Sequence, residues 1–167
     1  MSILWITLAL VAAQRLAELA YARRNTRRLL AEGAEENGAG HYPLLVGLHA
    51  LWLLSLALFV PADQPPNWLL LGVFAALQAV RLWVLASLGR FWTTRVITLP
   101  GAPLVRRGPY RWFRHPNYLV VAGEILVLPL AFGAWEIAVV FSLANAAVLA
   151  LRIRCEERAL SPRRPAP

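Results

Sequence analysis

The sequence predicts an all-α integral membrane protein with about five transmembrane helices and a short extended cytoplasmic excursion before the fourth. Hydrophobic residues make up 59% of the 167 residues, and a mean hydropathy of +0.54 is too high for an ordinary soluble domain. The apolar residues gather in five runs of roughly 20 residues, the length that a helix needs to cross a bilayer. The 17 basic residues are all arginines, and most of them lie between these runs.

The expected spans follow from the apolar runs and from the residues that end them. The first is interpreted as a retained membrane helix, because neither a charged n-region nor an obvious small-residue cleavage site marks a signal peptide. Pro61 ends the second, and Pro116 suits the first turn of the fourth, where its missing N–H would have no partner. The fifth is expected to continue as a helix through Leu160. The predicted spans are residues 2–21, 42–60, 68–88, 116–132 and 134–151.

The arginines predict the orientation of these spans. Four follow the first span, six lie between the third and fourth, and five follow the fifth, whereas residues 61–67 and 133–135 contain none. By the positive-inside rule, the arginine-bearing segments face the cytoplasm. The N-terminus is therefore expected outside and the C-terminus in the cytoplasm.

The segment between the third and fourth spans lacks a helical pattern. Residues 93–99 are rich in β-branched side chains, and Pro100-Gly101 indicates a turn. We expect a short extended excursion or a loose hairpin at the membrane surface. Because non-helical backbone at this depth must be covered by protein or line a wet cavity, the excursion predicts room for a polar cofactor. A single membrane domain is predicted over residues 1–160, followed by a Pro/Arg-rich tail over residues 161–167.

A cluster of arginines, aromatic residues and one histidine, residues 107–118, lies at the start of the fourth span. With Pro116 in the first turn, His115 is the expected N-cap residue, and the free backbone N–H groups there favour an anion. Glu124 falls on the same helix face as Asn117, and a carboxyl group within the bilayer predicts a functional role. The alternative for part of this cluster is an interfacial anchor, formed by Arg111, Trp112 and Phe113.

A second polar cluster lies where the fifth span leaves the bilayer. Arg152 and Glu156 are spaced i, i+4 on a continuing helix, which by itself would be an ordinary ion-paired exit. Because neighbouring helical residues point about 100° apart, only one of Glu156 and Glu157 is expected to enter a site. The two clusters share one predicted membrane face, which favours a single site formed by both.

These clusters resemble the isoprenylcysteine carboxyl methyltransferase family of membrane enzymes. The resemblance rests on Gly108-Pro109-Tyr110 leading into Arg114-His115-Pro116-Asn117-Tyr118, then on Arg152 and Glu156-Glu157 with Leu160. The N-terminal part, including residues 14–18 and 41–43, is similar to the bacterial branch, which implies a location in a bacterial inner (plasma) membrane. The resemblance implies a multi-helix membrane fold that binds S-adenosylmethionine in a cytosol-facing pocket, with a lipid entering laterally from the bilayer.

The resemblance also implies roles for individual residues. Arg114, His115 and Tyr118 would bind the amino-acid and ribose portions of the cofactor, and Gly108 and Tyr110 would frame it. The acidic pair would hold the amino group or position the substrate, and Arg152 would lie near the acceptor. The predicted cofactor-binding residues are Gly108, Tyr110, Arg114, His115, Pro116, Tyr118 and Glu157. The predicted catalytic residues are Arg152, Glu156 and Glu124.

The acceptor is expected to be a lipid. Family members that methylate prenylated proteins extend past the acidic pair with an aromatic, basic tail, whereas only residues 158–167 follow it here. Bacterial relatives are associated with O-methylation of long-chain phenolic or pyrone lipids. A phenol, with a pKa near ~10, needs a base, and the candidates are His115, Glu124 and Glu156. The alternatives are carboxyl methylation of a prenylated cysteine, a nicotinamide-dependent membrane reductase of related architecture, and a non-catalytic membrane scaffold.

The remaining polar residues are expected to have structural roles. Arg15 and Glu18 in the first span, and Gln78 and Arg81 in the third, predict interhelical polar pairing, with substrate contact as the alternative. No metal site is expected, because His41 and His49 lack a third ligand nearby. Nucleic-acid binding is not expected, because the arginines form no soluble basic face. A lone Cys155 excludes an intrachain disulfide.

Overall fold

The computed structural model describes residues 2–37, 40 and 42–160, so the predicted tail lies outside the described residues. Five α-helices dominate the fold, which confirms the all-α membrane class. Four are long and apolar enough to cross a bilayer, and α4 is a shorter apolar helix of 16 residues. The helices are α1 (Ile3–Ala31), α2 (Tyr42–Phe59), α3 (Trp68–Leu88), α4 (Pro116–Ala131) and α5 (Trp135–Leu160).

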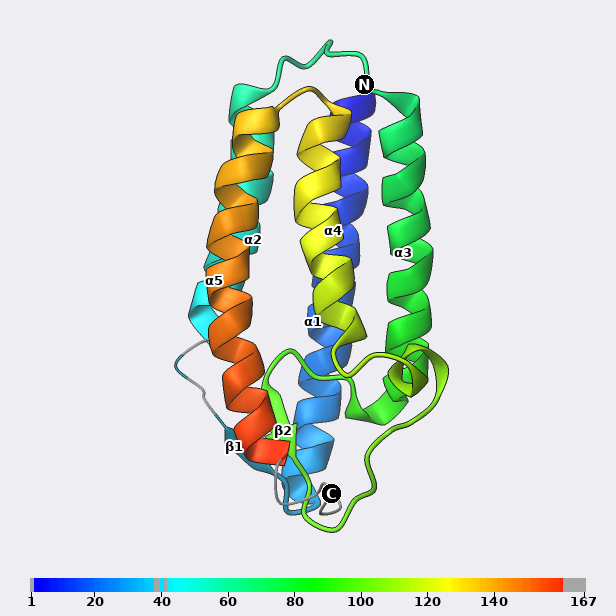
Figure 1. The fold of residues 1–167 in the computed structure, drawn as a ribbon, viewed down its shortest axis with the longest axis vertical. Helices are drawn as coiled ribbons and strands as arrows, with labels where there is room; N and C mark the ends of the chain where they lie inside the picture. The colour runs from blue at the N-terminus through cyan, green and yellow to red at the C-terminus, as the bar shows by residue number, and fades with distance from the viewer. Residues whose placement is uncertain (1, 38–39, 41, 161–167) are drawn as a thin grey trace.

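Helix α4 is the centre of the bundle. It packs between α3 and α5, and α1 runs behind it (Figure 1). Its buried residues Val121, Ile125 and Leu128 join a core that also contains Trp52 of α2 and Phe74 of α3. Many large apolar side chains on the outer faces of the bundle are exposed, as expected where helices meet lipid rather than water.

Helix α1 extends ten residues beyond the predicted boundary at residue 21. Ala22, Asn25 and Leu29 continue the buried face at helical spacing, while the arginines between them stay exposed. The helix ends at Ala31, and a Schellman motif follows: the N–H of Ala34 donates to the carbonyl of Leu29 at 2.9 Å, and Gly33 has a φ of +89°. Apolar composition alone could not show this polar extension.

Two short strands replace the loose hairpin. Strand β2 (Val96–Thr98) pairs antiparallel with β1 (Glu35–Asn37), which follows α1, rather than with the rest of its own segment. The Asn37 side chain donates to Thr98 Oγ1 at 2.9 Å, and Arg95 forms an ion pair with Glu36 at 2.9 Å. The expected hairpin is therefore wrong among the described residues, because the partner of β2 is the strand that follows α1.

The two ends of the bundle differ in composition. The N-terminal end of α1 and the α2–α3 and α4–α5 connections lie at one end (Figure 1). Both strands, the C-terminal ends of α1 and α5, and two 3-10 turns, η2 (Gly89–Phe91) and η3 (Gly108–Arg111), lie at the other. The arginine-bearing segments that the structure describes are therefore gathered at a single end.

Candidate active site

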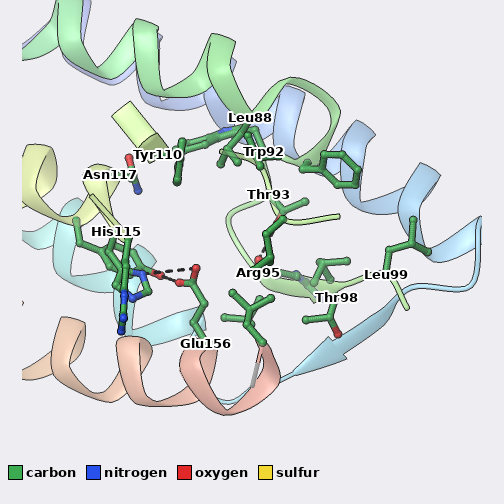
Figure 2. Close-up of a pocket in the computed structure, with 18 of the residues that line it drawn as sticks. Leu88, Trp92, Thr93, Arg95, Thr98, Leu99, Tyr110, His115, Asn117 and Glu156 are labelled. Carbon is green, nitrogen blue, oxygen red and sulfur yellow. Dashed lines mark hydrogen bonds and ion pairs between the residues drawn. The ribbon is translucent and has the colours of Figure 1, made fainter. Parts of the chain in front are cut away.

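A cavity of about 460 Å³ opens at the arginine-rich end of the bundle. Its lining comes from the ends of α1, α3, α4 and α5, from η2 and η3, and from β2 with its flanking loops (Figure 2). Of the predicted site residues, those that line the cavity are Tyr110, Arg114, His115, Tyr118, Arg152 and Glu156. The structure therefore brings the two sequence clusters together in one place.

The start of α4 positions the first cluster. His115 occupies the N-cap position and Pro116 the first helical position, as predicted, although the His115 side chain does not cap the helix. The His115 ring instead stacks on the Tyr118 ring, with centroids 5.4 Å apart and an interplanar angle of 16°. Tyr118, three residues further along the chain, thereby fixes the orientation of the imidazole toward the cavity.

A hydrogen-bond chain joins α4, α5 and the loop before β2. The Tyr118 hydroxyl donates to Glu156 and accepts from Arg152 Nε at 3.0 Å. The other end of the Arg152 guanidinium donates to the carbonyl of Thr94 at 2.6 Å. Arg152 is only 8% exposed, so these bonds form away from bulk water and hold the three segments in a defined arrangement.

The carboxylates of α5 face the imidazole of His115. His115 Nδ1 lies 3.7 Å from Glu156 Oε1, and Nε2 lies 3.7 Å from Glu157 Oε1. Figure 2 shows His115 and Glu156 pointing toward each other across the cavity wall. The Glu156 carboxylate holds the pKa of His115 above its ordinary value of 6.5, with a smaller contribution from Glu157 and against the effect of burial.

The raised pKa of His115 predicts a pH dependence of stability. The pKa of His115 is higher in the folded state than in the unfolded state. The ion pairs therefore contribute their full stabilisation below about pH 6.5, and this contribution is lost as pH rises through the folded-state pKa. Unfolding midpoints in detergent should fall across that window in the wild type. In a His115→Gln variant this part of the slope should be absent; an unchanged slope would contradict the assignment.

Gly108 lets η3 dock directly on α3. Its φ is +56°, and a Cβ atom there would lie 2.0 Å from Ser87 Oγ and 3.2 Å from Trp83 Nε1. Arg107 reinforces the contact by donating from Nε to the carbonyl of Ser87 at 2.7 Å. Gly108 does not line the cavity itself, but its backbone holds Tyr110 in the wall.

A Gly108→Ala variant should therefore be destabilised by about 1–3 kcal/mol through backbone strain, with additional cost from the contact with Ser87. The matched control is Gly72→Ala, because Gly72 lies within α3 and a Cβ there would meet nothing within 4 Å. Thermal unfolding of the two purified variants in the same detergent measures the difference. Equal midpoints for the two would contradict the docking role of Gly108.

Two cavity residues carry buried polar atoms that lack a hydrogen-bond partner among the described residues. They are Trp92 Nε1 and Asn117 Oδ1. Buried polar atoms are normally paired, so a polar ligand in the cavity would satisfy both of them. The cavity also has aromatic faces on which a cation or a nucleobase could stack, including Phe91, Trp92 and Phe113.

Three residues that no sequence motif predicted also contribute to this site: Asn25, Trp92 and Thr94. The Asn25 side chain donates to the carbonyl of Trp92 at 2.9 Å and so fixes the indole wall against α1. Thr94 contributes the backbone carbonyl that holds Arg152. The helical spacing of Asn25 with Ala22 and Leu29 could have indicated that Asn25 is buried. The role of Thr94 leaves no trace in the sequence, because it acts through its backbone carbonyl.

Glu124 lies apart from the cavity. It is 1% exposed and accepts hydrogen bonds from Arg15, Gln78 and Arg81 inside the bundle. The interhelical pairing predicted for these polar residues is thus present, and Glu124 is its fourth-helix partner. Glu157 contacts His115 and lies 4.0 Å from Arg114 without lining the cavity. Among the described residues, which exclude His41, no group of three acidic, histidine or cysteine side chains could hold a metal.

The fold and the cavity define a helical membrane protein with a polar site at one end of its bundle. The model of the isoprenylcysteine carboxyl methyltransferase family matches residues 69–162, more than half of the chain. The protein therefore belongs to this family. The matched region contains α4, most of α3 and all of α5, and with them every predicted site residue.

Two relatives match nearly the whole chain. A Bacillus subtilis protein named "Uncharacterized protein YpbQ" is 42% identical over 160 residues, covering 93% of this chain and 95% of the relative. An "Uncharacterized protein" of Haemophilus influenzae is 28% identical over 163 residues, covering 93% and 94%. No solved structure is significantly similar to the chain. Family membership suggests a membrane methyltransferase, and the apolar helices suggest an integral membrane protein.

Proposed function

We propose that the protein is a methyltransferase that uses S-adenosylmethionine to methylate a lipophilic acceptor at the cavity. The observation that carries this proposal is the meeting of His115 and Glu156, 3.7 Å apart, in the wall of a cavity of about 460 Å³. Segments from the middle and the end of the chain contribute cations, carboxylates and aromatic rings to one small space. Its volume lies within the range of about 300–1,000 Å³ that small-molecule sites occupy.

The residues present fit the chemical groups of this cofactor. Its carboxylate needs cations, which Arg114 and the protonated His115 supply, and its ammonium group needs a carboxylate such as Glu156 or Glu157. Its sulfonium and adenine suit the aromatic faces of the wall. The unpartnered atoms of Trp92 and Asn117 offer one donor and one acceptor for the remaining polar groups.

When bound, the cofactor supplies an electrophilic methyl group on a positively charged sulfur. The residues of the chain contribute alignment and proton transfer. The acceptor oxygen forms the new bond to carbon, its proton passes to a base, and the carbon–sulfur bond breaks with its electron pair remaining on sulfur. Of the three candidate bases, Glu124 lies apart from the cavity and is bound by two arginines. His115 and Glu156 face the cavity 3.7 Å apart, and the proton is proposed to pass to this pair.

The rest of the lining supports a lipophilic acceptor. Apolar side chains from four parts of the chain face the same cavity, namely Leu29, Leu88, Leu99 and Leu160. The proposed acceptor is a long-chain phenolic or pyrone lipid, which combines an ionisable ring oxygen with a hydrocarbon chain that could lie against these side chains. Carboxyl methylation of a prenylated cysteine remains the nearest alternative, since its acceptor is also lipophilic.

We also propose that the site faces the cytoplasm of a bacterium, with the N-terminus outside its inner membrane. The gathering of the described arginine-bearing segments at the cavity end of the bundle supports this orientation (Figure 1). It would place the cavity beside the cytosolic pool of cofactor and at the level of the lipid headgroups.

Transfer of a radiolabelled methyl group from S-adenosylmethionine into bacterial lipid extracts tests the proposed function. Purified protein in detergent should label a lipid product that survives mild alkali, as a methyl ether does. A farnesylated cysteine analogue tested in parallel should give little product, and its methyl ester would be released by alkali. Labelling of the analogue alone would support the carboxyl methylation alternative, and no labelling of either would contradict a methyltransferase.

A further inference from the structure

A buried ionic cluster lies inside the bundle, apart from the cavity. We define it by its four charged members and one amide: Arg15 and Glu18 of α1, Gln78 and Arg81 of α3, and Glu124 of α4. The side chains of Glu18, Arg81 and Glu124 are at most 7% exposed, and that of Arg15 is 14% exposed. Two positive and two negative charges make the ionic cluster neutral overall.

The charges divide into two pairs. Arg81 binds Glu18 through two contacts of 2.6 Å, one from Nε and one from Nη2, which is the bidentate geometry that guanidinium and carboxylate favour. Arg15 binds Glu124 at 2.7 Å, and 3.1 Å contacts from Arg81 to Glu124 and from Arg15 to Glu18 link the two pairs. Either pair can therefore be neutralised as a unit without leaving a net charge in the bundle.

The ionic cluster connects the three helices whose ends form much of the cavity wall. Glu124 lies six residues after Tyr118 on α4, a rise of about 9 Å. Helix α1 continues from Glu18 to Asn25, which fixes Trp92, and α3 continues from Arg81 to Ser87, on which Gly108 docks. A shift of α4 along or around its axis would move His115 and Tyr118 relative to both walls.

We propose that the Arg15–Glu124 pair positions the cavity, by fixing α4 in register against α1 and α3. Glu124 is thus a positioning residue, and its carboxylate acts through Tyr118 of the same helix and through the N-cap residue His115. This role replaces the direct catalytic role predicted for Glu124. It rests on the proposed function only for the ligand used to measure it, S-adenosylhomocysteine.

Charge-matched variants separate positioning from simple structural support. Glu124→Gln keeps the shape of the side chain but leaves the bundle with one uncompensated positive charge. The double variant Arg15→Gln, Glu124→Gln is neutral and retains the bidentate Arg81–Glu18 pair. Binding of S-adenosylhomocysteine is titrated at a temperature at which each variant is folded. Hydrogen exchange of the amides of residues 106–118 reports the same end of the protein without any ligand.

The single variant should bind the ligand about tenfold more weakly and exchange faster over residues 106–118. The double variant, which is neutral but lacks the Arg15–Glu124 pair, should recover heat stability and neither of these two properties. A single variant that is less heat-stable but has wild-type affinity and exchange would overturn the proposal, as would a double variant with wild-type affinity and exchange. Failure of the wild type to bind the ligand would contradict the proposed function instead, and the exchange pattern would still decide the positioning role.

Discussion

Glu156→Gln should weaken the binding of S-adenosylhomocysteine by roughly 30- to 150-fold. The substitution keeps the size of the side chain but removes the negative charge of the carboxylate, which faces His115 and accepts a hydrogen bond from the Tyr118 hydroxyl. Hydrogen bonds to charged groups contribute about 1.5–3 kcal/mol, and a loss of about 2–3 kcal/mol corresponds to this change in affinity. Isothermal titration of the purified variant in detergent measures it.

The matched control for this prediction is Glu32→Gln. Glu32 is an exposed glutamate at the end of α1, paired with Arg90 at 2.8 Å, and it does not line the cavity. Its substitution should leave the affinity within about twofold of the wild type, because exposed ion pairs contribute little. A loss of equal size in both variants would mean that general charge, and not the position of Glu156, determines binding.

Arg81→Leu should be the most destabilising single substitution among those considered. Arg81 binds both Glu18 and Glu124 inside the bundle, so its removal leaves two buried carboxylates with only Arg15 to balance them. Removing one partner of a buried ion pair costs about 3–5 kcal/mol. For a chain of this size the unfolding midpoint should fall by roughly 6–20 °C.

Thermal unfolding in detergent measures this effect, with Arg90→Leu as the control. Arg90 also pairs with a glutamate, but its side chain is 56% exposed, and exposed pairs contribute about 0–1 kcal/mol. Both variants lose an arginine–glutamate ion pair, so the difference between their unfolding midpoints measures the effect of burial. Similar midpoints for both would show that water reaches the ionic cluster and that its charges are not held in a dry interior.

Much of the fold could be predicted because lipid imposes simple requirements on sequence. Apolar runs of the right length gave the five helices, and Pro116 gave the start of α4. The end of α1 was missed because its last turns are charged on the outside, and only the spacing of Ala22, Asn25 and Leu29 shows the helix continuing. The β1–β2 pairing could not be predicted, because each strand has three residues and the partners are about 60 positions apart.

The candidate site was predictable to the extent that short motifs carried it. The number of spans between them predicts that the clusters at His115 and Glu156 share one membrane face, and the structure brings these two side chains within 3.7 Å. Glu124 shows the limit of this reasoning. Its helix face could be assigned from periodicity, but periodicity does not show whether that face meets a cavity or the arginines of α1 and α3. Only the packing of three helices decides this.

The most direct test of the central claim is a titration of the wild-type protein in detergent with S-adenosylhomocysteine and, separately, with a reduced nicotinamide dinucleotide. The cavity of about 460 Å³ lies toward the lower end of the usual range, which favours the ligand with a single nucleoside. We predict saturable binding of S-adenosylhomocysteine at one site, lost in His115→Ala, and no binding of the dinucleotide. Saturable binding of the dinucleotide alone, or of neither ligand, would contradict the account.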